Sequence, residues 1–408
     1  MKRNSLVSIG YSTKIGTKDA VREMIKQVTN SSENFQNPAW AMAFCGGNHN
    51  PMLFFDTIKK YFGNIPVVGG SAPGAISNTK VGYTGYECSL TVFSPSIEAP
   101  YIISERQLPE NEHETGKKLG IRMDKYARVT ADTPALLLYG YSKNTREKQL
   151  LNSGSKLLEG IQKYIGKPDI PPIIGGGLVS DPQYSPPVIF DGYEVCTDTA
   201  VCLVFSENIK ISTETTHGCI SGSGFFEITK CQNGIIYELE NRPALDVLLQ
   251  RGFNEKTVIL GLAKTNGRTN GTPEDYTVMN RKLINLNTID SSIQLSEKDC
   301  EEGDWIQILS RHKRNLLEST RYSSMKLMES LGENNILFTM YLDDVGRTSK
   351  ITGTDFEEAY LVQGAVKSKS PLVGFYTGSN IGVEKCGSFV QACTGVLAAF
   401  SLNIPGSR

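Results

Sequence analysis

The sequence of 408 residues offers little that would favour a membrane or a nucleic acid as its partner. No apolar run approaches the roughly 20 residues that span a bilayer, and the basic N-terminus lacks the apolar segment of a signal peptide. Lys plus Arg (42) nearly equal Asp plus Glu (43), so the formal net charge is -1 and attracts no polyanion. We expect a cytoplasmic protein that binds neither membrane nor nucleic acid.

Signatures of metal binding and catalysis are also scarce. The nine cysteines are scattered without a CxxC spacing, which is typical of reduced, mostly buried thiols, so we predict no metal site. No P-loop occurs, and the serines beside glycines do not match a G-x-S-x-G turn. Asp343 and Asp344 are adjacent, so on a strand they would point to opposite faces and form no carboxylate pair. We predict that the chain is not an enzyme.

The chain does contain a glycine-bearing pattern that occurs three times. Its copies are "NIPVVGGSAPG" (64–74), "DIPPIIGGGLVSD" (169–181) and "KSPLVGFYTGSNIG" (369–382). Each follows an apolar run and a segment with helical spacing, and each precedes a further strand-like segment that ends in "FS". Internal similarity of this kind indicates repeated supersecondary units. We predict an α/β fold of repeated strand–helix–strand–strand units with Gly-rich loops and parallel strands.

The glycines are expected where the second strand of each unit ends, at Gly69, Gly175 and Gly374. Such positions form either tight turns or crevices at the carboxyl ends of strands, where ligands collect. Arg347 is a candidate for binding a carboxylate, and the alternative for this residue is an ion pair with Asp343. The predicted ligand-binding residues are Gly70, Ser71, Gly176, Gly177, Arg347, Tyr376, Thr377 and Asn380.

The segment from 214 to 331 has a different pattern. Asn233-Gly234, between two strand-like runs, predicts a β-hairpin, and Pro243 predicts the start of a helix. Alternating strands are expected at 279–296 and 304–313, followed by an amphipathic helix at 315–331. We place a domain boundary near residue 250.

Taken together, these phrases resemble the FIST family. "ITKCQNGIIYELENRPALDVL" resembles the end of the FIST N-terminal domain, and "YLDDVGR" followed by "LVGFYTGSNIGV" resembles the FIST C-terminal domain. The resemblance implies a FIST N-like domain at 1–250, with an internal duplication at about 30–100 and 130–210, and a FIST C-like domain at 251–408. It covers roughly residues 30 to 400. Asn380 and the Asp343-Asp344 pair depart from the family pattern.

The resemblance also implies a function. The family is regarded as a sensory module of bacterial signalling that binds small molecules such as amino acids, so we expect a standalone sensor that relays to a partner such as a histidine kinase. Some members are haem proteins that sense nitric oxide, and in that alternative the iron ligand would be His217 or His49. A third alternative is an interaction scaffold without a ligand.

Overall fold

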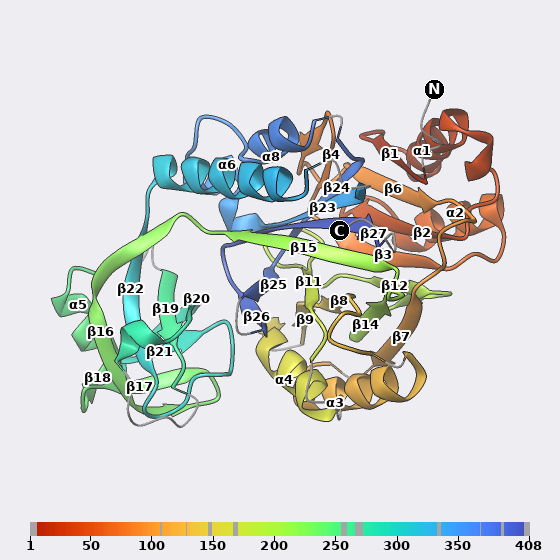
Figure 1. Ribbon diagram of the computed structural model, residues 1–408. Helices are drawn as coiled ribbons and strands as arrows, with labels where there is room; N and C mark the ends of the chain where they lie inside the picture. Colours follow the sequence, from red (N-terminus) through yellow and green to blue (C-terminus); the bar gives the residue numbers. More distant parts are fainter. Residues whose placement is uncertain are drawn as a thin grey trace.

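The computed structural model confirms the α/β fold (Figure 1). Its sheets form a larger part and a smaller module beside it. It describes residues 6–106, 108–127, 129–145, 149–165, 170–253, 259–265, 272–332, 336–367, 369–384 and 387–403. None of the helices in these ranges is long and apolar enough to cross a membrane.

Three six-stranded sheets form the larger part of the molecule. The first runs β1 (Val7–Ser12), β6 (Cys88–Phe93), β2 (Trp40–Gly46), β3 (Val67–Ala72), β12 (Ile189–Gly192) and β13 (Val195–Cys196). The second runs β26 (Gly387–Gln391), β25 (Ser379–Glu384), β11 (Ile173–Leu178), β8 (Ala135–Gly140), β14 (Thr199–Val204) and β7 (Tyr101–Arg106). The third runs β15 (Ile209–Thr216), β27 (Gly395–Leu402), β23 (Ile336–Asp344), β24 (Leu372–Thr377), β4 (Ala75–Ser77) and β5 (Val81–Gly82).

The three sheets repeat one plan, which confirms the predicted units. Each has a central parallel pair, β2–β3, β8–β11 or β23–β24, as a strand–helix–strand crossover requires. Each is completed by a hairpin from another unit: β12–β13 joins β3, β25–β26 joins β11, and β4–β5 joins β24. Each unit therefore adds its hairpin to the sheet of another unit, so the three units are joined in a ring. The linear sequence pattern did not reveal this arrangement.

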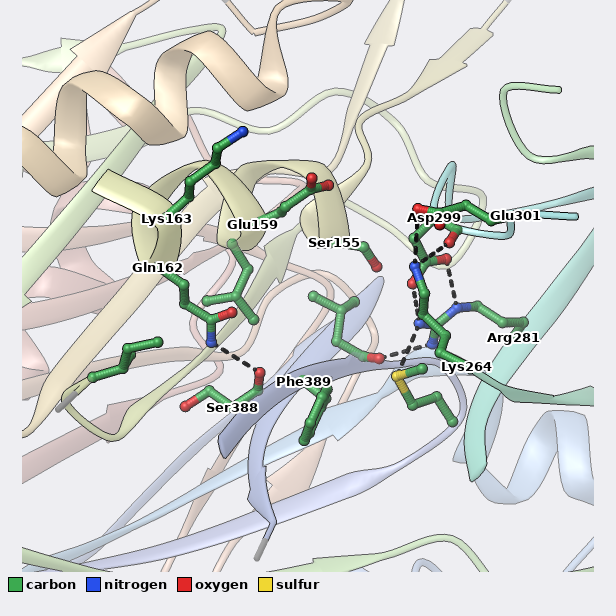
Figure 2. Close-up of a pocket in the computed structure, with 14 residues that line it drawn as sticks. Ser155, Glu159, Gln162, Lys163, Lys264, Arg281, Asp299, Glu301, Ser388 and Phe389 are labelled. Atoms are coloured by element: carbon green, nitrogen blue, oxygen red, sulfur yellow. Dashed lines mark hydrogen bonds and ion pairs between the residues drawn. The ribbon is translucent and has the colours of Figure 1, made fainter. Parts of the chain in front are cut away.

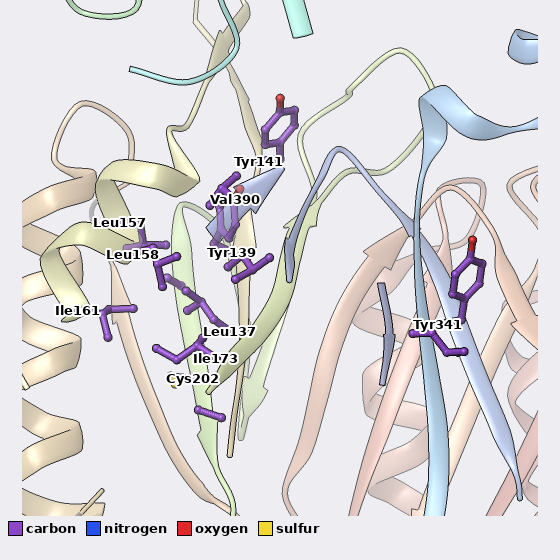
Figure 3. Close-up of a cluster of buried hydrophobic side chains, with 14 of the residues drawn as sticks. Leu137, Tyr139, Tyr141, Leu157, Leu158, Ile161, Ile173, Cys202, Tyr341 and Val390 are labelled. Atoms are coloured by element: carbon purple, nitrogen blue, oxygen red, sulfur yellow. The ribbon is translucent and has the colours of Figure 1, made fainter. Parts of the chain in front are cut away.

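A pair of helices covers the outer face of each sheet. The helices are α1 (Thr17–Ser31) with α2 (Pro51–Phe62), α3 (Glu112–Arg122) with α4 (Gly154–Tyr164), and α6 (Lys313–Ser330) with α8 (Ala359–Val366). Strand residues alternate between these helices and a shared centre. Phe44, Leu138 and Leu342 hold equivalent positions and meet in one central cluster. On the outer face of the second sheet, the α4 side chains Leu157, Leu158 and Ile161 pack on Leu137, Ile173 and Cys202 (Figure 3).

The repeated glycines lie inside strands and not in the loops that the sequence predicted. Gly175, with φ of 153°, lies within β11, and a Cβ there would collide with the carbonyl oxygen of Leu137 on the paired strand. A Cβ on Gly69 would likewise collide with the carbonyl oxygen of Ala43 on β2. Glycine is required at Gly69 and Gly175 because their positive φ would aim a Cβ at the carbonyl oxygen of the paired strand.

A smaller module, which we call the barrel (residues 217–311), is inserted between β15 and α6. Its pairings close into a ring through β16 (Cys219–Gln232), β22 (Trp305–Arg311), β19 (Ile259–Ala263), β20 (Val278–Asn287), β21 (Ser292–Leu295) and β17 (Ile235–Leu239). The turn at Asn233-Gly234 confirms the predicted hairpin. The boundary expected near residue 250 falls at the end of α5 (Ala244–Gln250), inside this module.

The remaining elements are short. They are β9 (Ser142–Asn144), β10 (Gln149–Leu151), β18 (Arg242–Pro243), α7 (Ser349–Thr352), a π-helical turn at Met123–Ala127 and 3₁₀ turns at Glu33–Phe35, Pro273–Asp275 and Val345–Arg347.

Candidate functional site

A pocket of about 390 Å³ lies where the barrel meets the second sheet (Figure 2). Helix α4 and strand β26 contribute one side, and β20 with the segment 296–304 of the barrel contributes the other. The lining residues are Ser155, Leu158, Glu159, Gln162, Lys163, Ile170, Lys264, Met279, Arg281, Asp299, Glu301, Ser388, Phe389 and Val390. A molecule bound there would contact both modules.

Arg281 is the central contact between the two modules at this pocket. Its guanidinium is fully buried and donates to both carboxylate oxygens of Asp299, at 3.1 and 2.5 Å. Its remaining terminal nitrogen donates 2.8 Å to the carbonyl oxygen of Val390 on β26. Burial opposes ionisation of Asp299, but the adjacent guanidinium holds the pKa of this carboxyl below its usual range. The ion pair therefore stays charged and ties the barrel strand to the second sheet.

We call residues 296–304 the docking loop, because their side chains make further contacts with the core. The Glu297 carboxylate accepts hydrogen bonds from the Ser153 hydroxyl (3.0 Å) and the Ser155 amide (2.9 Å) at the start of α4. Lys298 forms an ion pair with Glu112 of α3 at 2.9 Å. Burial raises the pKa of Glu297 to about 7, although Arg281 and the α4 donors favour its ionised form.

The pocket offers both apolar and charged groups to a ligand. Leu158, Phe389 and Val390 supply apolar contacts. The Lys264 ammonium donates to the Asp299 carbonyl oxygen (2.6 Å) and lies 3.6 Å from the Glu301 carboxylate, which is largely exposed. Pockets of this size with a few placed polar groups are typical of small-molecule sites.

The predicted glycine-rich residues lie elsewhere. Gly70 and Ser71 belong to β3, and Gly176 and Gly177 belong to β11; all four are buried within their sheets. The Ser71 hydroxyl accepts a hydrogen bond from the Val188 amide at 3.1 Å. None of the four lines the pocket of Figure 2, and their role in ligand binding stays a prediction.

Arg347 is fully buried at the end of β23 and has partners within the protein. Its guanidinium donates to both carboxylate oxygens of Glu358 at 2.6 Å, to the Thr320 hydroxyl at 3.0 Å and to the Cys393 carbonyl at 3.2 Å. The Asp343 carboxyl, named as the alternative partner, also lies close, with one oxygen 3.3 Å from the Arg347 Nε. These contacts occupy the bidentate donor face that a ligand carboxylate would need.

The two adjacent aspartates have separate surroundings, as expected for neighbouring strand residues. Burial, together with the nearby Glu358 carboxylate, raises the pKa of Asp343 well above its usual range. Asp344 instead accepts hydrogen bonds from the amides of Gly346 (2.7 Å) and Cys393 (2.8 Å).

The three predicted residues of β24 and β25 are also buried. The Thr377 hydroxyl donates to the Asn380 side-chain oxygen at 2.7 Å, and the Asn380 amide donates to the Thr394 carbonyl at 2.6 Å. The Tyr376 ring packs edge-on against Tyr83 with centroids 5.3 Å apart. Among the described residues the Tyr376 hydroxyl has no hydrogen-bond partner. These side chains join strands, and their role as ligand contacts stays a prediction.

The two candidate haem ligands are engaged inside the protein. The His49 ring nitrogens lie 3.2 Å from the Thr17 hydroxyl and 3.1 Å from the Tyr86 carbonyl. The His217 Nδ1 accepts the Cys219 amide at 3.0 Å, and burial lowers the pKa of this ring. Neither histidine lines the pocket of Figure 2. His49 has a partner at each ring nitrogen, which leaves neither free to bind iron. Haem binding by His217 stays a prediction.

Sequence reasoning did not identify Arg281, Glu297 or Asp299. The docking loop reads "SEKDCEEGD", and such a dense run of charge normally indicates a solvated turn. Glu297 and Asp299 are nevertheless only 1% and 6% exposed. These carboxylates can be buried because Arg281 donates to Asp299 and the start of α4 donates to Glu297. No sequence pattern links these donors to the docking loop.

The structure combines a repeated core, an inserted barrel and a pocket at their junction. Comparison with protein-family models assigns the class, because the FIST N domain matches residues 39–242, half of the chain. The chain therefore belongs to the FIST family, whose domains are sensory modules of signal transduction. No curated protein matches the sequence. The resemblance of the C-terminal part to a FIST C domain stays a prediction.

Proposed function

We propose that this protein is a sensor that binds a small molecule in the pocket of Figure 2 and relays binding through the position of the barrel. The observation that carries the proposal is the location of the pocket. Its two sides belong to separate modules, and the charged contacts between those modules, Arg281 to Val390 and Glu297 to α4, lie beside it.

The lining suggests what kind of molecule fits. An anionic group would pair with Lys264 in place of Glu301, and the apolar remainder would pack on Phe389 and Leu158. Because Asp299 and Glu301 belong to the docking loop, a ligand that contacts them changes the free energy of the loop–core contacts. Binding then shifts the population of barrel positions.

Native mass spectrometry of the purified protein, followed by ligand-dependent thermal stability, tests the proposal. We expect a bound metabolite whose affinity falls in Lys264→Met and Lys163→Met and is unchanged in the control Lys26→Met on α1. Unchanged affinity in both pocket variants would overturn this location. Loss of binding in Asn380→Ala alone would instead place the ligand at the end of β24.

The same mass measurement distinguishes the alternative functions. A mass excess equal to haem would support the gas-sensor alternative, for which the histidine contacts supply no support. The bare chain mass, with no stabilising compound, would favour an interaction scaffold. The signalling partner, such as a histidine kinase, and the cytoplasmic location stay predictions.

A further inference from the structure

Two cysteines, one on β16 and one in the docking loop, lie together in the barrel. Cys231 is near the end of β16 and half-buried, and Cys300 is within the loop and 6% exposed. The Cys231 thiol donates 3.5 Å to the carbonyl oxygen of Cys300. The β16 strand is irregular between Ile228 and Cys231, which turns this end of the strand toward the loop.

The hairpin turn that follows Cys231 packs on the same loop. A Cβ on Gly234 would lie 2.5 Å from the Glu297 carbonyl oxygen, and the Gly234 carbonyl accepts the Leu295 amide at 2.9 Å. The two thiols are thus carried by segments that are already in contact, as a covalent bond between them requires.

The chemical surroundings of the pair favour one thiol as the nucleophile. Hydrogen bonding with the Cys300 side chain lowers the pKa of the Cys231 thiol, whereas the same interaction and burial raise the pKa of Cys300. Reactive thiols are partly exposed, have a lowered pKa and lie beside a second thiol. A second neighbouring pair, Cys45 and Cys88, is 1% and 0% exposed and therefore shielded from reagents.

We propose that Cys231 and Cys300 form a peroxide-reactive dithiol that closes to a disulfide between β16 and the docking loop. The Cys231 thiolate attacks a hydroperoxide oxygen, the O–O bond breaks, and Cys231 becomes a sulfenic acid as water or an alcohol leaves. The Cys300 sulfur then attacks the Cys231 sulfur, the S–O bond breaks, and a second water leaves as the disulfide forms. The two thiols are oxidised by two electrons and the peroxide is reduced by two.

The disulfide would act on the loop that holds the two modules together. Asp299 and Glu301, on either side of Cys300, line the pocket, and Glu297 and Lys298 contact the core helices. Closing the bond fixes this loop to the β16–β17 hairpin. The disulfide chemistry does not depend on whether a ligand binds in the pocket, so its test and that of the proposed function are separate.

The test exposes the reduced full-length protein to hydrogen peroxide, alkylates the remaining thiols and maps the cysteine-containing peptides by mass spectrometry. We expect a linked Cys231–Cys300 peptide that dithiothreitol removes. In Cys300→Ser, Cys231 should accumulate as a sulfenic acid that dimedone traps. In Cys231→Ser, Cys300 should stay reduced, because it is buried.

The shielded pair supplies the matched control. Cys45→Ser should leave formation of the Cys231–Cys300 bond unchanged. Oxidation of Cys45 and Cys88 before Cys231, a linkage of Cys231 or Cys300 to Cys386, or alkylation of Cys231 no faster than that of the buried Cys202 would each overturn the proposal. Cys231→Ala and Cys300→Ala repeat the measurement if a serine variant fails to fold.

Discussion

The Glu297 carboxyl connects the stability of the module junction to pH. It is 1% exposed, and burial raises its pKa from 4.5 to about 7, with Asp299 raising it and Arg281 and the α4 donors lowering it. The unfolded chain therefore loses this proton at a lower pH than the folded protein. Stability from this group is complete below pH 4.5 and falls as pH rises toward 7.

The size of the effect follows from the pKa difference. A shift from 4.5 to about 7 corresponds to about 3 kcal/mol at full ionisation. Glu297→Gln keeps an oxygen acceptor for the Ser153 and Ser155 donors but removes the titration. The variant should therefore gain up to about 3 kcal/mol relative to the wild type between pH 5 and pH 8.

Urea unfolding at a series of pH values measures this difference. The chain has two tryptophans, Trp40 in the first sheet and Trp305 in the barrel, so Trp40→Phe leaves a barrel reporter. Glu301→Gln makes the same change at a largely exposed position of the same loop and should leave the pH dependence nearly unchanged. A wild-type minus Glu297→Gln difference that is constant from pH 5 to pH 8 would refute the reasoning.

Three further predictions concern stability, two of them at buried positions and one at an exposed position of α8. Arg347→Ala removes one partner from a fully buried ion-pair network and should cost about 3–5 kcal/mol in urea unfolding, whereas Arg314→Ala, at an exposed pair, should cost less than about 1 kcal/mol. Gly175→Ala should strongly destabilise or prevent folding, because its Cβ would collide with the Leu137 carbonyl. Gly364→Ala, in α8 with open space around its Cβ, should stabilise by about 0.5–1 kcal/mol in the same assay.

The local plan of the fold was accessible from the sequence because it depends on short-range patterns. Apolar runs, helical spacing and recurring glycines correctly predicted the parallel units, and Asn233-Gly234 correctly predicted a hairpin. The same patterns could not show which sheet each hairpin joins, because β4–β5 (residues 75–82) and β24 (residues 372–377) lie far apart in the sequence. The glycines were expected in loops. Their position within strands, where a Cβ on Gly175 would meet the Leu137 carbonyl oxygen, is visible only in three dimensions.

The candidate site was less accessible for a related reason. The sequence analysis assigned no role to Glu297 and Asp299, because their partners, Arg281 and the start of α4, are brought to them only by the fold. Arg347 was predicted as a ligand-binding residue, with an ion pair inside the protein as the alternative. In the structure its carboxylate contacts are Glu358 and Asp343 of the same chain, which sequence spacing alone did not distinguish from a ligand.

The exchanged hairpins make the three units depend on one another for complete sheets. Each of the three sheets borrows two strands from a different unit, so none of the units has a complete set of strands by itself. A chain ending near residue 250 would leave the edge of β11 without β25 and the β4–β5 hairpin without β24. Removal of any one unit would therefore leave strand edges without a partner in both of the others.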